Sequence, residues 1–192
     1  LASALAGNEV LTSLDLSKNE LDAEAGKALA SALAGNTVLT SLKLTENQLC
    51  GIDQLGIGTY GSSGIRALAS ALGSSVLTHL EIGRNNIGDE GAKALADALK
   101  SGRSMLTYLN LEENNIGVEG VQALAEALES GTAVLNKLDI SRNNIGDEGV
   151  VALAQAISKA PALALKRLVV SAVVKWDERL ETVCDSRGVK LT

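Results

Sequence analysis

The sequence repeats itself at nearly fixed spacing, and this repetition constrains the fold more than any other feature. Five segments share a pattern of three leucine-type residues, an asparagine and a further leucine or isoleucine: LTSLDLSKNEL from Leu11, LTSLKLTENQL from Leu39, LTHLEIGRNNI from Leu77, LTYLNLEENNI from Leu106 and LNKLDISRNNI from Leu135. Their starts are spaced 28, 38, 29 and 29 residues apart, and LKRLVV, 30 residues further on at Leu165, is a degenerate sixth copy. One such unit cannot bury its apolar face alone, so neighbouring units must stack into a solenoid.

Each repeat contains a strand-like half and a helix-like half. Apolar and polar residues alternate in the first half, which predicts short strands near residues 13–16, 41–44, 79–82, 108–111 and 137–140. The second half, for example EGAKALADALK, has small and apolar residues on one helical stripe, formed by Ala94, Leu95, Ala98 and Leu99. We expect a tight backbone turn at the helix starts, which carry Gly91, Gly120 and Gly149.

One asparagine recurs at the end of every strand-like half. These residues form a column: Asn19, Asn47, Asn85, Asn114 and Asn143. We expect each to turn inward as its strand ends, because its amide can pair backbone groups that the turn leaves free. Each layer would then be bonded to the next through the asparagines.

The repeated segments resemble the leucine-rich repeat family. The 28- and 29-residue periods, the NNIGDEG turn and a full helix per repeat look like the ribonuclease-inhibitor subtype, which includes the repeat domains of NOD-like receptors, tropomodulins and the Ran GTPase-activating proteins. The resemblance covers Leu1 to about Val174. It implies an α/β fold, a right-handed horseshoe arc with a parallel sheet on the concave side and helices on the convex side.

The expected domain organisation follows from the repeat boundaries. Residues 1–10 look like a remnant helix of a preceding repeat, since the chain starts inside a structural unit. Residues 11–168 hold five full repeats and a degenerate sixth strand, with an insertion at 50–61. Residues 169–192 are interpreted as a C-terminal cap, in which Trp176 covers the exposed core and GVKL adds a last strand.

Composition narrows the environment and the partners. The chain has 2% aromatic residues and no Phe, so its core must be built from Leu, Ile, Val and Ala. The net charge is −6 and acids alternate with bases, which argues against nucleic acid. Cys50 and Cys184 form no Cys-x-x-Cys motif and fit free thiols in a reducing, cytoplasmic compartment. No run of about 18 apolar residues exists, so we expect no membrane span.

The stretch GIGTYG, residues 56–61, matches the glycine spacing of a dinucleotide-binding loop. That loop follows its strand directly, whereas here about ten residues intervene, and the acid Glu81 belongs to the repeat's own pattern. We therefore expect no cofactor. A flexible insertion is the favoured interpretation, and an insertion that contributes to a binding surface is the alternative, because Tyr60 should be exposed. Ser62 or Ser63 should cap the following helix.

Alternate strand residues should point to the concave side, where three columns can be read. The middle of the arc gathers the single histidine, a tyrosine and several polar groups, and these are the candidate partner-binding residues together with Tyr60: His79, Glu81, Arg84, Tyr108, Asn110 and Glu112. Catalysis and a zinc site at His79, Glu81 and Glu112 are disfavoured because an open sheet face lacks a desolvated pocket. A solvated mixed-charge face and a protein- or peptide-binding patch remain as alternatives.

The sequence thus favours a non-catalytic protein-interaction module, part of a larger intracellular leucine-rich-repeat protein, for which the resemblance suggests a NOD-like receptor. The expected partner is a protein or peptide on the concave face, without cofactor, metal or nucleic acid. The alternative is a GTPase-activating or actin-capping type of regulator built on the same repeats, although this chain lacks the long acidic segment of the Ran GTPase-activating proteins.

Overall fold

The computed structural model describes residues 1–52, 57–171 and 178–192. Within these residues seven helices alternate with seven short strands. The helices are α1 (Ala2–Ala6), α2 (Ala23–Gly35), α3 (Ser63–Ala71), α4 (Gly88–Lys100), α5 (Val118–Glu129), α6 (Gly146–Lys159) and α7 (Glu178–Ser186). The strands are β1 (Ser13–Asp15), β2 (Ser41–Lys43), β3 (His79–Glu81), β4 (Tyr108–Asn110), β5 (Lys137–Asp139), β6 (Arg167–Val169) and β7 (Lys190–Leu191).

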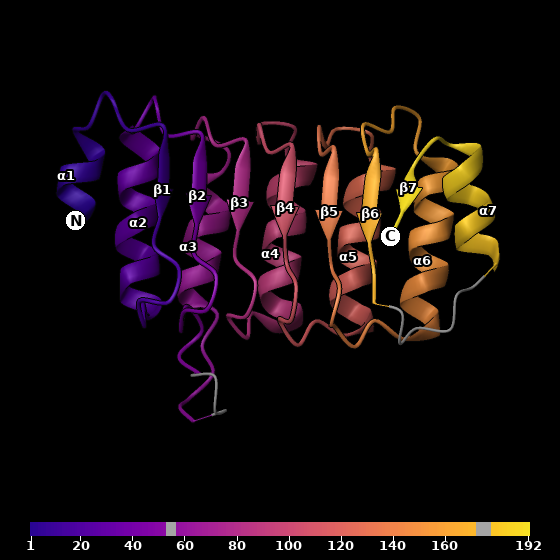
Figure 1. Ribbon diagram of the computed structural model, residues 1–192, viewed down its shortest axis with the longest axis horizontal. Helices are drawn as coiled ribbons and strands as arrows, with labels where there is room; N and C mark the ends of the chain where they lie inside the picture. The colour runs from indigo at the N-terminus through magenta and orange to yellow at the C-terminus, as the bar shows by residue number, and fades with distance from the viewer. Residues whose placement is uncertain (53–56, 172–177) are drawn as a thin grey trace.

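The strands form one parallel sheet in sequence order, β1 to β7, as Figure 1 shows. Pairing follows the repeat: His79 lies opposite Ser41 on one side and Tyr108 on the other. The prediction of strands at the repeat starts is confirmed, with each strand one residue shorter than expected. The degenerate sixth copy and GVKL also supply strands, β6 and β7.

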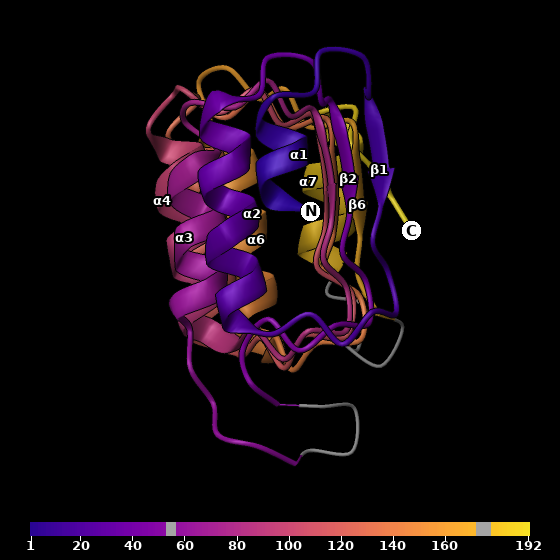
Figure 2. The ribbon, with the colours of Figure 1, turned by 90° about the vertical axis from the view of Figure 1, so that its left-hand side faces the viewer.

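The molecule has two layers, a sheet and a row of helices (Figure 2). The chain crosses from each strand through a helix to the next strand in a right-handed sense, so the helices cover one face of the sheet only (Figures 1 and 2). The first strand and the C-terminal end stand out from the strands between them, and the open face of the sheet is therefore concave. The predicted α/β solenoid is confirmed.

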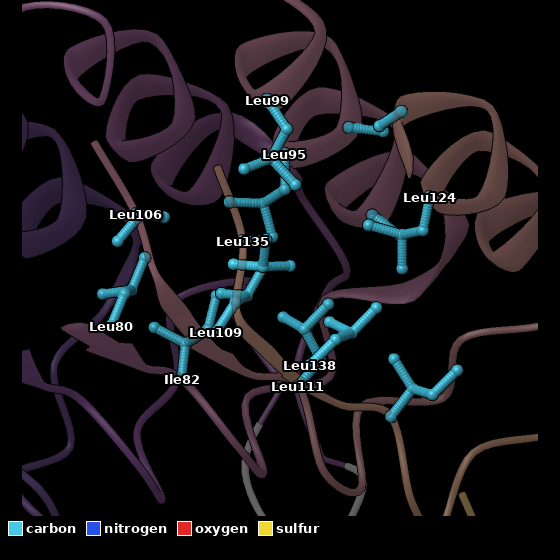
Figure 3. Close-up of a cluster of buried hydrophobic side chains, with 14 of the residues drawn as sticks. Leu80, Ile82, Leu95, Leu99, Leu106, Leu109, Leu111, Leu124, Leu135 and Leu138 are labelled. Atoms are coloured by element: carbon cyan, nitrogen blue, oxygen red, sulfur yellow. The ribbon is translucent and has the colours of Figure 1, made fainter. Parts of the chain in front are cut away.

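The core lies between the two layers and is built from equivalent residues of successive repeats. Figure 3 shows Leu80 and Ile82 of the third repeat beside Leu109 and Leu111 of the fourth, all directed toward the helices. In α4 the buried residues are Gly91, Ala92, Leu95, Ala96 and Leu99. The predicted stripe was therefore wrong in part, because Ala94 and Ala98 are only partly buried and flank the core.

The glycines at the helix starts have a different role from the one expected. Gly91, Gly120 and Gly149 do not adopt the positive φ that a tight glycine turn would require. Close packing explains them instead: a Cβ on Gly120 would lie 2.6 Å from Asp89 Oδ1 and 2.7 Å from Ile116 Cγ2. A larger residue would push neighbouring repeats apart.

The asparagine column lies where each strand turns into its loop. Asn114 Oδ1 accepts hydrogen bonds from the backbone N–H groups of Asn85 (2.9 Å) and Ile87 (3.4 Å) in the preceding repeat. Its Nδ2 donates to the carbonyls of Ile82 and Glu112. Asn47, Asn85 and Asn143 are also buried and bonded in this way, whereas Asn19 is exposed. The asparagine ladder thus pairs buried backbone groups of neighbouring repeats.

The C-terminal end continues the two layers. Helix α7 lies beside α6 and β7 pairs with β6, so Leu180, Cys184 and Val189 join the core. Val173 and Trp176, which the sequence suggested as part of a cap, lie outside the described residues.

Candidate partner-binding surface

The start of each strand contributes one side chain to a row on the concave face. Strand register brings His79, Tyr108 and Lys137 together as neighbours in β3, β4 and β5. The His79 ring meets the Tyr108 ring edge to face, with centroids 5.9 Å apart. Lys137 Nζ lies 4.4 Å from the centre of the same tyrosine ring, a cation–π contact. These contacts hold three solvent-accessible side chains in a fixed cluster.

The histidine of this cluster is exposed. Its Nδ1 lies 2.8 Å from the hydroxyl of Thr78, which leaves Nε2 directed away from that bond. Among the described residues, no group of three or more His, Cys, Asp and Glu side chains lies close enough to hold a metal ion. The arrangement suits recognition by rings, hydrogen bonds and charge rather than proton transfer in a desolvated pocket.

The end of each strand contributes a second row, which is largely engaged within the protein. Glu81 Oε1 lies 3.2 Å from Lys43 Nζ, and the hydrogen bond and charge of Glu81 raise the pKa of Lys43. Asn110 Oδ1 accepts a 2.8 Å bond from the backbone N–H of Glu112, which closes a local turn. The Asn110 side-chain oxygen is therefore engaged by the backbone two residues further on, and Nδ2 is the other polar atom of this amide.

A ladder of alternating charge runs along the rim just beyond the strands. Arg84 contacts Glu46 and Glu113, each at 3.1 Å, and Arg142 contacts Glu112 at 3.4 Å and Glu113 at 3.3 Å. Lys18 extends the ladder to Glu46 at 3.6 Å. The residue before each ladder asparagine thus alternates in sign over five repeats. That alternation was present in the sequence, but the importance of Lys18 and Glu46 was missed.

A threonine ladder at the other end of the strands was also missed. The hydroxyls of Thr40, Thr78 and Thr107 each donate to the backbone carbonyl of the residue one repeat earlier, at 3.1 to 3.2 Å. The recurring Leu-Thr pair at the repeat starts was the available signal. These bonds tie the strand starts together and so support the row that contains His79 and Tyr108.

Tyr60 lies apart from the other candidates, at the edge where strands pass into helices. Its hydroxyl donates a 2.8 Å bond to the carbonyl of Ile87, and its ring lies over Gly88, in the next repeat. The side chain is 42% exposed, so it keeps an accessible face despite this anchor. His79 and Tyr108, by contrast, begin their strands on the sheet face. The structure brings six of the seven candidates together and leaves Tyr60 on a separate edge.

The insertion around Tyr60 is paired at its base. Ile52 and Gly58 form an antiparallel bridge, and the N–H of Gly61 donates a 2.9 Å bond to the carbonyl of Cys50. Gly51 and Gly58 lie against each other so closely that a Cβ on Gly58 would be 2.0 Å from the Gly51 carbonyl oxygen. Of the glycines of GIGTYG, Gly58 therefore serves a close backbone approach, whereas a Cβ on Gly61 would meet nothing within 4 Å. Gly56 lies outside the described residues. Ser62 is the N-cap of α3, but its side chain makes no capping bond.

Two further features concern the protein as a whole. Cys50 and Cys184 are free and buried, and they lie far apart in the order of elements, Cys50 after β2 and Cys184 in α7. Of the helices in the described part of the chain, none combines the length and the apolar character needed to cross a bilayer.

A single-layer parallel sheet stacked on a row of helices, tied by an asparagine ladder, defines a leucine-rich-repeat solenoid. Comparison with protein families supports this class: the family model described as "Leucine Rich repeat" matches residues 7–30, 73–96, 104–125 and 133–154. The repeat that carries the insertion falls between the first two matches.

Solved structures give the same fold. One similar structure is "Leiomodin-1 Actin-Binding Site 2 (ABS2)", which aligns with a TM-score of 0.57 at 16% identity. The alignment covers 97% of this chain and 84% of the leiomodin chain. At this identity the similarity establishes the fold alone. No curated protein sequence matches the chain significantly.

Proposed function

We propose that the chain is a non-catalytic protein-interaction module that binds a protein or peptide partner on its concave face. The observation that carries this proposal is the cluster of exposed His79 with half-buried Tyr108 and Lys137 on three adjacent strands. Tyrosine, histidine and lysine in mutual contact offer an aromatic surface, hydrogen-bonding groups and charge to one ligand.

Rigidity supports the proposal as strongly as composition does. The cluster stands on paired strands that the threonine and asparagine ladders connect. Side chains that are already ordered lose little conformational entropy when a partner binds. Glu81, Arg84, Asn110 and Glu112 surround the cluster and would orient the partner through polar contacts. Tyr60 would contact only a partner that extends to the insertion edge.

We also propose the repeat subtype, the domain limits and the location of the protein. The 28- and 29-residue periods and a full helix in each repeat support the ribonuclease-inhibitor-like subtype, as in NOD-like receptor repeat domains. Residues 1–10 would belong to a preceding repeat, 11–168 to the repeats and 169–192 to a cap, in keeping with the position of α7 beside α6. Two buried, unbridged thiols fit a cytoplasmic location.

The experiment that tests the proposal compares faces of the solenoid. Immobilised wild-type protein is used to capture partners from an extract of the source cells, and captured proteins are identified by mass spectrometry. The double variant His79→Ala/Tyr108→Ala should bind the specific partner about tenfold more weakly, with an unchanged melting temperature. The matched control is Arg66→Ala/Gln122→Ala on the convex helices, which should bind as wild type. A partner lost with the control and retained by the concave variant would refute the proposal.

An actin- or GTPase-directed regulator is the second candidate. The leiomodin-1 structure, whose title names an actin-binding site, is the observation that favours its actin form. Co-sedimentation with filamentous actin and a pyrene-actin assembly assay test it directly. Absence of binding to monomeric and filamentous actin would leave the general interaction module as the better proposal.

A further inference from the structure

Three cations form a row across the C-terminal part of the concave face. Lys137, Arg167 and Lys190 each begin a strand, and the register pairs Lys137 with Arg167 and Arg167 with Lys190. Arg167 and Lys190 are exposed and Lys137 is partly so. This basic row continues directly from Tyr108, which pairs with Lys137.

The basic row has no internal neutralisation. Within residues 1–52, 57–171 and 178–192, every ion pair on the concave side and its rim involves Lys18, Lys43, Arg84 or Arg142. In the row, Lys137 contacts the Tyr108 ring, and Arg167 Nε donates to the Thr192 hydroxyl at 3.4 Å. Neither contact cancels a charge.

This arrangement is unfavourable for folding alone. Neighbouring strands lie about 4.8 Å apart, and like charges on laterally paired residues destabilise a sheet. The chain carries a net charge of −6, and elsewhere on the same face it pairs its cations with acids. A row of three unpaired cations in such a protein is better explained by a ligand that supplies the missing negative charge.

We propose that the basic row binds the acidic face of a helix in a protein partner. This inference rests on the proposed function, because it specifies the partner that the concave face would take. In an α-helix, residues i and i+3 are about 4.5 Å apart along the axis, close to the strand spacing of about 4.8 Å. A helix lying across β5, β6 and β7 can therefore present successive carboxylates to Lys137, Arg167 and Lys190, while its next turn contacts Tyr108 and His79.

Other acidic ligands fit less well. An extended peptide places same-side residues about 6.6 Å apart, so its carboxylates would fall out of step with the row. A nucleic acid backbone would meet Asp139, which strand alternation places on the same face as Lys137, and Glu112, which contacts Arg142. Its uniform negative charge would be opposed there. An acidic helix can place its charge on one face only.

The test uses a helical peptide of about 18 residues, held by a side-chain staple, with glutamates at i, i+3 and i+7 on one face. Its control has the same composition with glutamates distributed around the helix. Fluorescence anisotropy in about 50 mM salt measures both, since surface charge is less screened there. The patterned peptide should bind at least about tenfold more tightly than the control peptide.

Protein variants locate the site. Arg167→Gln/Lys190→Gln should weaken binding of the patterned peptide about tenfold, and Arg167→Lys should retain most of it. Lys159→Gln, which removes one exposed cation at the end of α6 on the other layer, should change binding less than about twofold. Circular dichroism melting of each variant separates loss of binding from loss of fold.

Three results would overturn the inference: equal binding of both peptides, unchanged binding by the Arg167→Gln/Lys190→Gln variant, or stronger binding of heparin or a single-stranded oligonucleotide through the same residues. The last would identify a polyanion instead of an acidic helix. None of these results depends on the capture experiment with His79→Ala/Tyr108→Ala, so failure of the inference and failure of the proposed function can be told apart.

Discussion

Replacing Asn114 with alanine would interrupt the centre of the asparagine ladder. The side chain is fully buried and takes part in four hydrogen bonds. It accepts from the N–H groups of Asn85 at 2.9 Å and Ile87 at 3.4 Å, and it donates to the carbonyls of Ile82 at 2.9 Å and Glu112 at 3.3 Å. Alanine would remove all four bonds without admitting another polar group.

The expected cost depends on which backbone groups are left unpaired. The Ile82 carbonyl still accepts from Asn85 Nδ2 at 3.2 Å, and the Glu112 carbonyl still accepts from the Arg84 N–H at 2.9 Å. The two N–H groups in the preceding repeat lose the partner described for them. An unpaired buried donor costs about 1–3 kcal/mol, and the long bond to Ile87 contributes least. Asn114→Ala should therefore lower the free energy of unfolding by about 2–4 kcal/mol.

The matched control is Asn19→Ala at the first position of the same column. Asn19 is exposed, and its side chain donates one bond, to the Ser17 carbonyl. Its removal should change the free energy of unfolding by less than about 0.5 kcal/mol. Urea denaturation followed by circular dichroism measures both variants, with m-values compared to wild type. Equal costs at Asn19 and Asn114, or a cost below about 0.5 kcal/mol at Asn114, would refute the reasoning.

Three further predictions concern Gly120, the two cysteines and the insertion. Gly120→Ala should destabilise the protein by about 1–3 kcal/mol, because its Cβ would meet Asp89 Oδ1 at 2.6 Å. The control Gly35→Ala, at an open position, should be neutral, and similar urea midpoints for the two variants would contradict this prediction. Burial raises the pKa of Cys50 to about 12 and that of Cys184 to about 11. At pH 8 both thiols should therefore resist alkylation until the protein is denatured, which intact mass measures. Rapid labelling of the native protein, or a disulfide, would contradict this prediction. Deleting residues 51–60 should preserve the fold, because Cys50 and Gly61 are already hydrogen-bonded to each other. ATP or NAD should not shift the melting temperature of the protein. A nucleotide-dependent shift that the deletion removes would instead support a phosphate-binding role for the insertion.

The periodic part of this protein could be read from the sequence. When repeats stack at constant spacing, residues at equivalent positions become spatial neighbours, so alignment of the repeats is also the pairing register of the sheet. His79 therefore had to lie beside Tyr108, and Asn85 beside Asn114. The same logic extended to the degenerate copy at Leu165, whose spacing was enough to locate β6.

The three-dimensional structure decided the contacts that depend on packing distance or break the period. Position 120 has no room for a side chain, because Asp89 and Ile116 occupy the space beside Gly120. A sequence pattern cannot show such a packing distance. Tyr60 belongs to an insertion without an equivalent in other repeats, so only packing could determine its bond to Ile87. Lys190 lies outside the repeat pattern, and its position beside Arg167 became visible only when β7 paired with β6. Repetition encodes contacts between equivalent residues, whereas an insertion or a terminal segment is placed by the surfaces it meets.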